Sequence, residues 1–135
     1  MDYYDNAVDV HESAEVLYNN QKYRMSIYNV CLAAELYLKS GLQFVEHEPR
    51  LEYSHDVIGI YRCLNSRFRS SKDLTQAINM CRKYFNETRY PYEGTGVFTA
   101  ELAKDFLDYL SDIRNYVDNE CVATLEDLKK RFEDN

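Results

Sequence analysis

A chain of 135 residues can bury one hydrophobic core but is too short for two domains of ordinary size, so we expect a single domain over residues 1–135. Hydrophobic residues make up 45% and charged residues 29%, with only four glycines and two prolines, which excludes a disordered or fibrous protein. The net charge of −7 opposes indiscriminate binding to polyanions.

The sequence contains no run of about 18 apolar residues, and the N-terminal stretch MDYYDNAVDVHE is acidic where a secretory signal would be basic and then apolar. We therefore expect a cytoplasmic protein with no membrane association. The four cysteines are widely spaced, without a Cys-x-x-Cys pair or a neighbouring cluster of cysteine and histidine. This spacing predicts free thiols, and we expect neither a metal site nor a cofactor.

Apolar residues recur at spacings of three and four along almost the whole chain, and no segment alternates cleanly with a period of two. This pattern predicts an all-α fold, a helical bundle of four to five main helices plus a short C-terminal helix, with antiparallel neighbours. The main helices are expected over about residues 5–20, 22–46, 56–69, 72–89 and 100–117, and the last helix from Thr124.

The expected second helix is apolar on several sides, which predicts a central position with more than one helix packed against it. After it, Pro49 and its polar neighbours interrupt the helical period in EHEPRLEYSHD and predict a loop. Either Ser54 or His55 is expected to cap the third helix, and Thr99 to cap the fifth.

Positive charge is concentrated between Arg62 and Arg89, where seven basic residues stand against two acidic ones. A segment of this kind can form a face that accepts phosphate, or it can simply be a solvated helix surface.

The fourth helix is expected to end at Arg89, because Pro91 disfavours helical geometry at Tyr90. Arg89 could hold a phosphate with two hydrogen bonds, while Tyr90 offers a ring face on which a base can stack. The glycines of the following PYEGTG stretch would let backbone approach such a ligand closely. The alternative is that Arg89 only binds the last carbonyl groups of the helix.

Glu35 and Lys39 lie one helical turn apart, so their side chains can form an ion pair. Their apolar surroundings predict a position near a groove between helices, where Glu35 could also meet Arg89. His55 is the third candidate in this region. It either contacts a ligand or only bonds to the backbone or a carboxylate at the start of its helix.

Four stretches of the chain resemble the HEPN domain, the higher eukaryote and prokaryote nucleotide-binding domain, over about residues 14–118. They are AEVLYNNQKYRMSIYNVCLAAELYLKSGL, HDVIGIYRCL, YFNETRYPYE and FTAELAKDFLDYLSDI. The most specific part is an ordered set of residues on successive helices. It consists of Glu35, Leu38-Lys39, His55-Asp56 and Arg89-Tyr90-Pro91.

The resemblance implies an up-and-down helical bundle of a kind that commonly forms homodimers through its helices. Members of the family include ribonuclease toxins of toxin–antitoxin-like systems, partners of small nucleotidyltransferases, and accessory domains for which nucleotide binding has been proposed. The fold alone does not choose among these activities.

The ribonuclease branch carries an Arg-x4–6-His signature late in the bundle, in which histidine transfers a proton and arginine stabilises phosphate charge. In this chain Arg114 is the late arginine, but Asn119, Glu120 and Cys121 stand at the histidine positions. The one match at this spacing, Arg50 with His55, falls in the expected loop before the third helix. The resemblance therefore implies a branch with the Arg-Tyr-Pro motif and without the nuclease signature.

We therefore expect a binding module rather than an enzyme, acting as a homodimer on a nucleotide, an RNA or a nucleotidyltransferase partner. The expected ligand contacts are Arg89, Tyr90, Glu35, Lys39 and His55. One alternative is a divergent metal-independent ribonuclease that uses His55 with Arg50 or Arg89. Another is a purely structural dimerisation protein.

Overall fold

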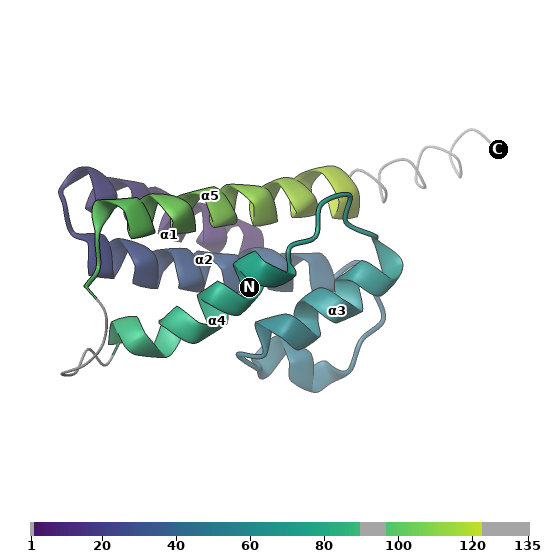
Figure 1. Cartoon of the computed structure of the whole chain (residues 1–135). Helices are drawn as coiled ribbons and strands as arrows, with labels where there is room; N and C mark the ends of the chain where they lie inside the picture. The colour runs from purple at the N-terminus through teal and green to yellow at the C-terminus, as the bar shows by residue number, and fades with distance from the viewer. Residues whose placement is uncertain (1, 90–96, 123–135) are drawn as a thin grey trace.

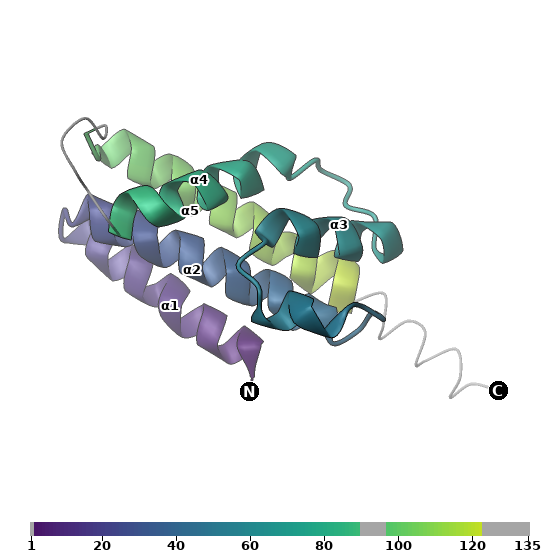
Figure 2. The same cartoon turned by 90° about the horizontal axis from the view of Figure 1, so that it is seen from below.

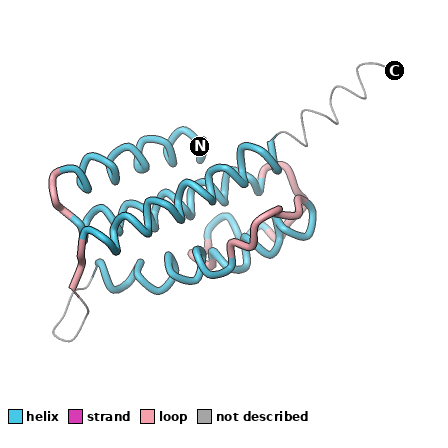
Figure 3. Tube along the Cα trace, turned by 45° about the horizontal axis from the view of Figure 1, so that its top comes forward, coloured by secondary structure: helices cyan, strands magenta, loops and turns pink. Residues whose placement is uncertain are grey.

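The structure is a computed structural model that describes residues 2–89 and 97–122. Within these ranges it contains five α-helices and no strand, which confirms the all-α fold (Figures 1 and 3). The helices are α1 (Tyr3–Asn19), α2 (Tyr23–Leu42), α3 (Val57–Arg67), α4 (Thr75–Arg89) and α5 (Ala100–Tyr116), with a short 3-10 helix η1 (Pro49–Tyr53) and a π-helical turn η2 (Val117–Val122) after α5. The expected last helix from Thr124 lies outside the described residues.

Helices α1, α2, α4 and α5 run alternately up and down and form the body of the bundle (Figure 1). Between α2 and α4 the chain leaves this body to form η1 and α3, which lie beside the ends of α2 and α4 (Figures 1 and 2). The up-and-down bundle predicted from the sequence is thus confirmed, with α3 as a side element. This side element is what encloses the candidate site described below.

Helix α2 is central, as its apolar pattern predicted, and packs against α1, α3, α4 and α5. Its buried residues lie on several sides of the helix, and Ile27, Tyr37 and Leu38 are fully buried. Gly41 lies close to α3, because a Cβ atom at this position would be 3.1 Å from the methyl groups of Leu64. Glycine therefore allows the side element to approach the central helix closely.

Two helix boundaries differ from the prediction. Helix α2 ends at Leu42 rather than near residue 46, because the amides of Phe44 and Val45 bond to carbonyls three residues earlier, in a tighter turn. Helix α4 begins at Thr75, later than residue 72, and Leu74 before it is buried in the core. The segment predicted as a loop around Pro49 contains the short helix η1.

The cap of α3 is Asp56, not Ser54 or His55. The Asp56 carboxylate accepts a hydrogen bond from the Gly59 amide at 3.0 Å, while Ser54 Oγ accepts one from the Asp56 amide at 2.9 Å. A carboxylate is favoured at the cap position because it interacts with the positive end of the helix as well as accepting a hydrogen bond. The predicted cap of α5 is confirmed, since Thr99 Oγ1 accepts from the Leu102 amide at 3.1 Å.

Candidate functional site

Helix α2, the residues just before α3, and helix α4 enclose a cavity of about 310 Å³, which we call the first cavity. Its apolar lining comes from α2, α3 and α4, and its polar groups come from α2, α4 and the turn before α3. The lining residues are Cys31, Glu35, His55, Val57, Cys81, Arg82, Phe85, Asn86 and Arg89.

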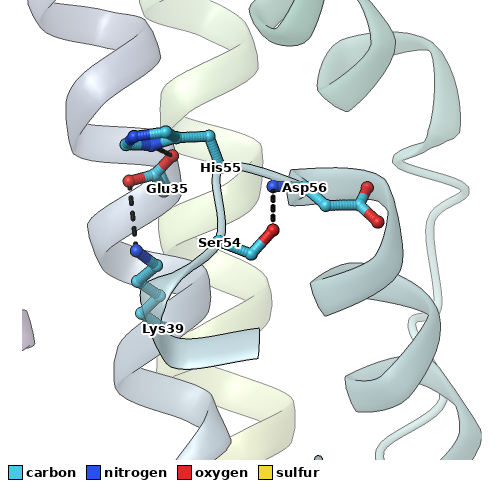
Figure 4. A network of polar contacts seen from close by, with 5 residues as sticks. All are labelled: Glu35, Lys39, Ser54, His55 and Asp56. Carbon is cyan, nitrogen blue, oxygen red and sulfur yellow. Dashed lines mark hydrogen bonds and ion pairs between the residues drawn. The ribbon is translucent and has the colours of Figure 1, made fainter. Parts of the chain in front are cut away.

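Glu35 is the centre of a polar contact network beside this cavity (Figure 4). Its side chain is only 7% exposed, and its two carboxylate oxygens have different partners. Oε1 lies 2.8 Å from His55 Nδ1, and Oε2 lies 3.3 Å from Lys39 Nζ. Because a buried carboxylate is costly without a partner, Lys39 compensates Glu35, and Glu35 in turn fixes the imidazole of His55.

Three aromatic rings stack in a row beside the first cavity, and two of them, His55 and Phe85, line it. The His55 ring stacks on Phe85 with centroids 5.6 Å apart and planes 29° apart, and Phe85 stacks on Tyr28 at 5.9 Å and 27°. The guanidinium carbon of Arg89 lies 5.0 Å from the Phe85 centroid. The His55 side chain is 70% exposed. The row therefore ends in an imidazole that is fixed by Glu35 yet open to solvent.

The end of α4 is bonded to the beginning of α2. Arg24 Nη1 donates a 2.7 Å hydrogen bond to the carbonyl of Thr88, and Thr88 Oγ1 bonds back to the carbonyl of Tyr84 at 2.8 Å. Arg24 thus binds one of the last carbonyl groups of the helix, a role that the sequence had suggested for Arg89. These contacts hold the part of α4 that carries Phe85 and Arg89.

A second cavity, of about 550 Å³, lies next to the first and shares two lining residues with it, His55 and Arg82. The other residues of the second cavity come from the turn before α3 and from α3 itself. They are Ser54, Asp56, Ile58, Gly59 and Arg62. Arg62 and Arg82 were not among the predicted site residues, although the excess of positive charge between residues 62 and 89 contained the signal for them.

The structure brings together three of the five predicted site residues, since Glu35, His55 and Arg89 all line the first cavity. Lys39 contacts Glu35 without lining the cavity. Tyr90 lies outside the described residues. Arg50, considered as a partner of His55 in the nuclease alternative, instead bonds to Glu48 at 2.9 Å on the surface and lines neither cavity.

The cysteines are free thiols, and Cys31 and Cys81 form part of the floor of the first cavity. Burial, together with a hydrogen bond between these two thiols, raises the pKa of Cys31.

Among residues 2–89 and 97–122, no group of three or more histidine, cysteine or acidic side chains is arranged to hold a metal ion. Over the same ranges, none of the helices has the length and apolar character needed to cross a bilayer.

The described part of the chain is thus an all-α domain, an up-and-down bundle of four helices with a small side helix. Its first cavity is lined by both apolar and polar side chains. The family model of the HEPN domain matches residues 1–120, and the chain therefore belongs to the HEPN family. This confirms the resemblance found in the sequence. A search of curated proteins and a search of solved structures gave no match.

Proposed function

We propose that this HEPN domain binds a nucleotide in the first cavity, with the base stacked on His55, and acts as a binding module rather than a nuclease. The observation that carries this proposal is the exposed imidazole at the end of the ring row, fixed from behind by Phe85 and from the side by Glu35. A ring held in one orientation loses little entropy when a base stacks on it. Base stacking on such a ring contributes about 1–3 kcal/mol.

The remaining lining suits a base and its sugar. Val57 and the two cysteines provide apolar surface, and the amide of Asn86 and the guanidinium of Arg89 supply hydrogen-bonding groups. The volume of about 310 Å³ lies at the lower end of the range of small-molecule sites, roughly 300–1,000 Å³. These dimensions favour one nucleotide over a long strand.

Calorimetric titration of the purified protein with AMP, GMP, CMP and UMP tests the proposal. We expect at least one of these to bind, and His55→Ala to weaken that nucleotide about tenfold because the stacking surface is lost. Tyr53→Ala is the matched control, since it also removes an exposed ring near α3 but lies outside both cavities. If no nucleotide binds at millimolar concentration, or if both variants weaken binding equally, the proposal is wrong.

A ribonuclease that uses His55 with Arg89 is the second candidate, favoured by the 2.8 Å contact between Glu35 and His55. A carboxylate that fixes Nδ1 leaves Nε2 to transfer a proton, as in catalytic dyads. The version with Arg50 has lost its support, because Arg50 is paired with Glu48 away from the cavities.

Incubation of the protein with RNA in the presence of a chelator separates the binding module from the nuclease. Cleavage by the wild type that His55→Ala abolishes would establish the nuclease.

Homodimer formation and docking on a nucleotidyltransferase remain further parts of the proposal, and they rest on membership of the family. A single domain over residues 1–135 and a cytoplasmic location, both expected from the sequence, are also parts of the proposal. Light scattering after size exclusion tests the homodimer directly. A monomer at every accessible concentration would also remove the purely structural alternative, which requires dimerisation.

A further inference from the structure

The second cavity is lined by two arginines, one from α3 and one from α4. Arg62 on α3 and Arg82 on α4 are both exposed, and both line this cavity. Among residues 2–89 and 97–122, neither side chain forms an ion pair or a hydrogen bond. The two helices therefore present two guanidinium groups to one space, and neither group forms an ion pair with a described residue.

The acidic group in the same cavity is already engaged. Asp56 is the cap of α3, and its carboxylate accepts the Gly59 amide at 3.0 Å. The positive end of this helix is therefore satisfied by the chain itself. An anion entering the cavity would be bound by the guanidinium groups of Arg62 and Arg82. Planar guanidinium groups bind phosphate with two parallel hydrogen bonds, which makes phosphate the anion that fits them best.

His55 connects this cavity to the first one. Its ring belongs to the lining of both cavities, as does Arg82. A ligand whose base stacks on His55 would therefore have its other end next to the two arginines. A nucleotide has this layout, with an aromatic base at one end and a phosphate at the other.

We propose that the second cavity is a phosphate subsite, in which Arg62 and Arg82 hold the phosphate of the nucleotide whose base stacks on His55. The inference rests on the proposed function and specifies its ligand as a free nucleoside phosphate, not a nucleoside. It also assigns the binding of the phosphate to α3, the side element, and to the middle of α4. The net charge of −7 over the whole chain disfavours longer polyanions, so the subsite selects a single nucleotide.

Calorimetry with adenosine, guanosine, cytidine and uridine, each beside its 5′-monophosphate, tests the subsite. For the base that binds, we expect the monophosphate to bind about tenfold or more tightly than the nucleoside, because bonds to a charged group are strong. Arg62→Gln and Arg82→Gln should each remove about tenfold of the affinity for the monophosphate. Arg62→Gln, at a position that lines only the second cavity, should leave the affinity for the nucleoside within about twofold, because the first cavity and the ring row are intact.

The matched controls are Arg67→Gln on α3 and Lys83→Gln on α4. Each makes the same change in charge on the same helix at an exposed position that lines neither cavity. If the controls weaken the monophosphate as much as Arg62→Gln and Arg82→Gln do, the effect is one of general charge and the subsite is refuted. Circular dichroism of each variant verifies that it is folded.

The outcomes separate the subsite from the proposed function. Equal affinities for nucleoside and monophosphate, with His55→Ala still weakening both, would overturn the subsite and leave nucleotide binding in place. Failure of every compound to bind would overturn both. A short oligoribonucleotide with a 5′-phosphate that binds more tightly than the monophosphate would overturn the assignment to a free nucleotide.

Discussion

Glu35, Lys39 and His55 show how one buried carboxylate connects the core to the surface. The side chains of Glu35 and Lys39 are 7% and 8% exposed, whereas that of His55 is 70% exposed. A buried ion pair adds little net stability, because its desolvation cost offsets its attraction. Its role here is orientation, since the carboxylate that Lys39 compensates is the group that fixes the imidazole.

This balance predicts opposite results for single and double substitutions. Glu35→Leu and Lys39→Met should each lower the free energy of unfolding by about 3 kcal/mol, because each leaves the other charge buried without its partner. The double variant should recover most of that loss, since neither charge remains. Urea unfolding measures all three. The double variant should nevertheless bind nucleotide more weakly than the wild type does, because the His55 imidazole has lost its contact with Glu35.

The surface pair Arg50 and Glu48 provides the control, with side chains 83% and 65% exposed. Glu48→Ala should change the free energy of unfolding by less than about 0.5 kcal/mol. A double variant at Glu35 and Lys39 that is as unstable as the two single losses added together would contradict this account, because additive losses mean that the two side chains do not compensate each other.

At the scale of helices, α1 and α2 are joined by polar contacts as well as by packing. Ser26 Oγ donates a 2.7 Å hydrogen bond to the Ala14 carbonyl, and His11 Nδ1 lies 2.9 Å from the Tyr37 hydroxyl. His11 is buried, and this burial lowers its pKa from the ordinary value of 6.5. Arg114 lowers the pKa of His11 further, while Glu15 and Glu12 oppose the shift.

The lowered pKa of His11 predicts that acid weakens the contact between α1 and α2. Below pH 6.5 the unfolded chain takes up a proton at this position before the folded chain does, so stability falls as the pH drops toward the folded pKa of His11. The contribution is complete above pH 6.5. Melting temperatures of the wild type and of His11→Gln at about pH 7.5 and about pH 5.5 test this. We expect a smaller fall between the two pH values in the variant, because it has no titrating group at this position. An equal fall in the variant and the wild type would contradict the assignment.

The sequence predicted the helices better than their arrangement. Regular apolar spacing located α1 to α5, and Pro91 located the end of α4, because both signals are local. The sequence offered Glu35, His55 and Arg89 as candidates for a ligand site, but only the structure places them around one cavity. Arg62 and Arg82 were recognised only as part of a basic segment. Periodicity shows which side of a helix faces outward, but not which outward sides of two helices adjoin.

At the scale of the molecule, α2 is the element on which the other helices pack. A substitution that removes buried side-chain atoms from α2 should therefore destabilise the whole fold. Leu38→Ala, at a fully buried position, should lower the free energy of unfolding by about 3 kcal/mol. Val16→Ala is the control, since Val16 is 59% exposed on α1, and it should cost less than about 0.5 kcal/mol.

If residues 1–135 form one domain, Leu38→Ala should shift a single unfolding transition, seen alike by circular dichroism and by tyrosine fluorescence. Tyrosine is the natural probe, because the chain has 13 tyrosines and no tryptophan. Two separate transitions would show that part of the chain unfolds independently of α2.

The positions of α1 and of the two cavities have a consequence for genetics. The walls of the cavities come from α2, α3, α4 and the turn before α3, whereas α1 lies on the side of α2 away from α4 (Figures 1 and 2). Random mutagenesis, followed by selection for loss of nucleotide binding, should therefore yield alleles that cluster in one part of the fold. Substitutions near the cavities would be recovered, and substitutions on the outer surface of α1 would not, because they leave nucleotide binding intact.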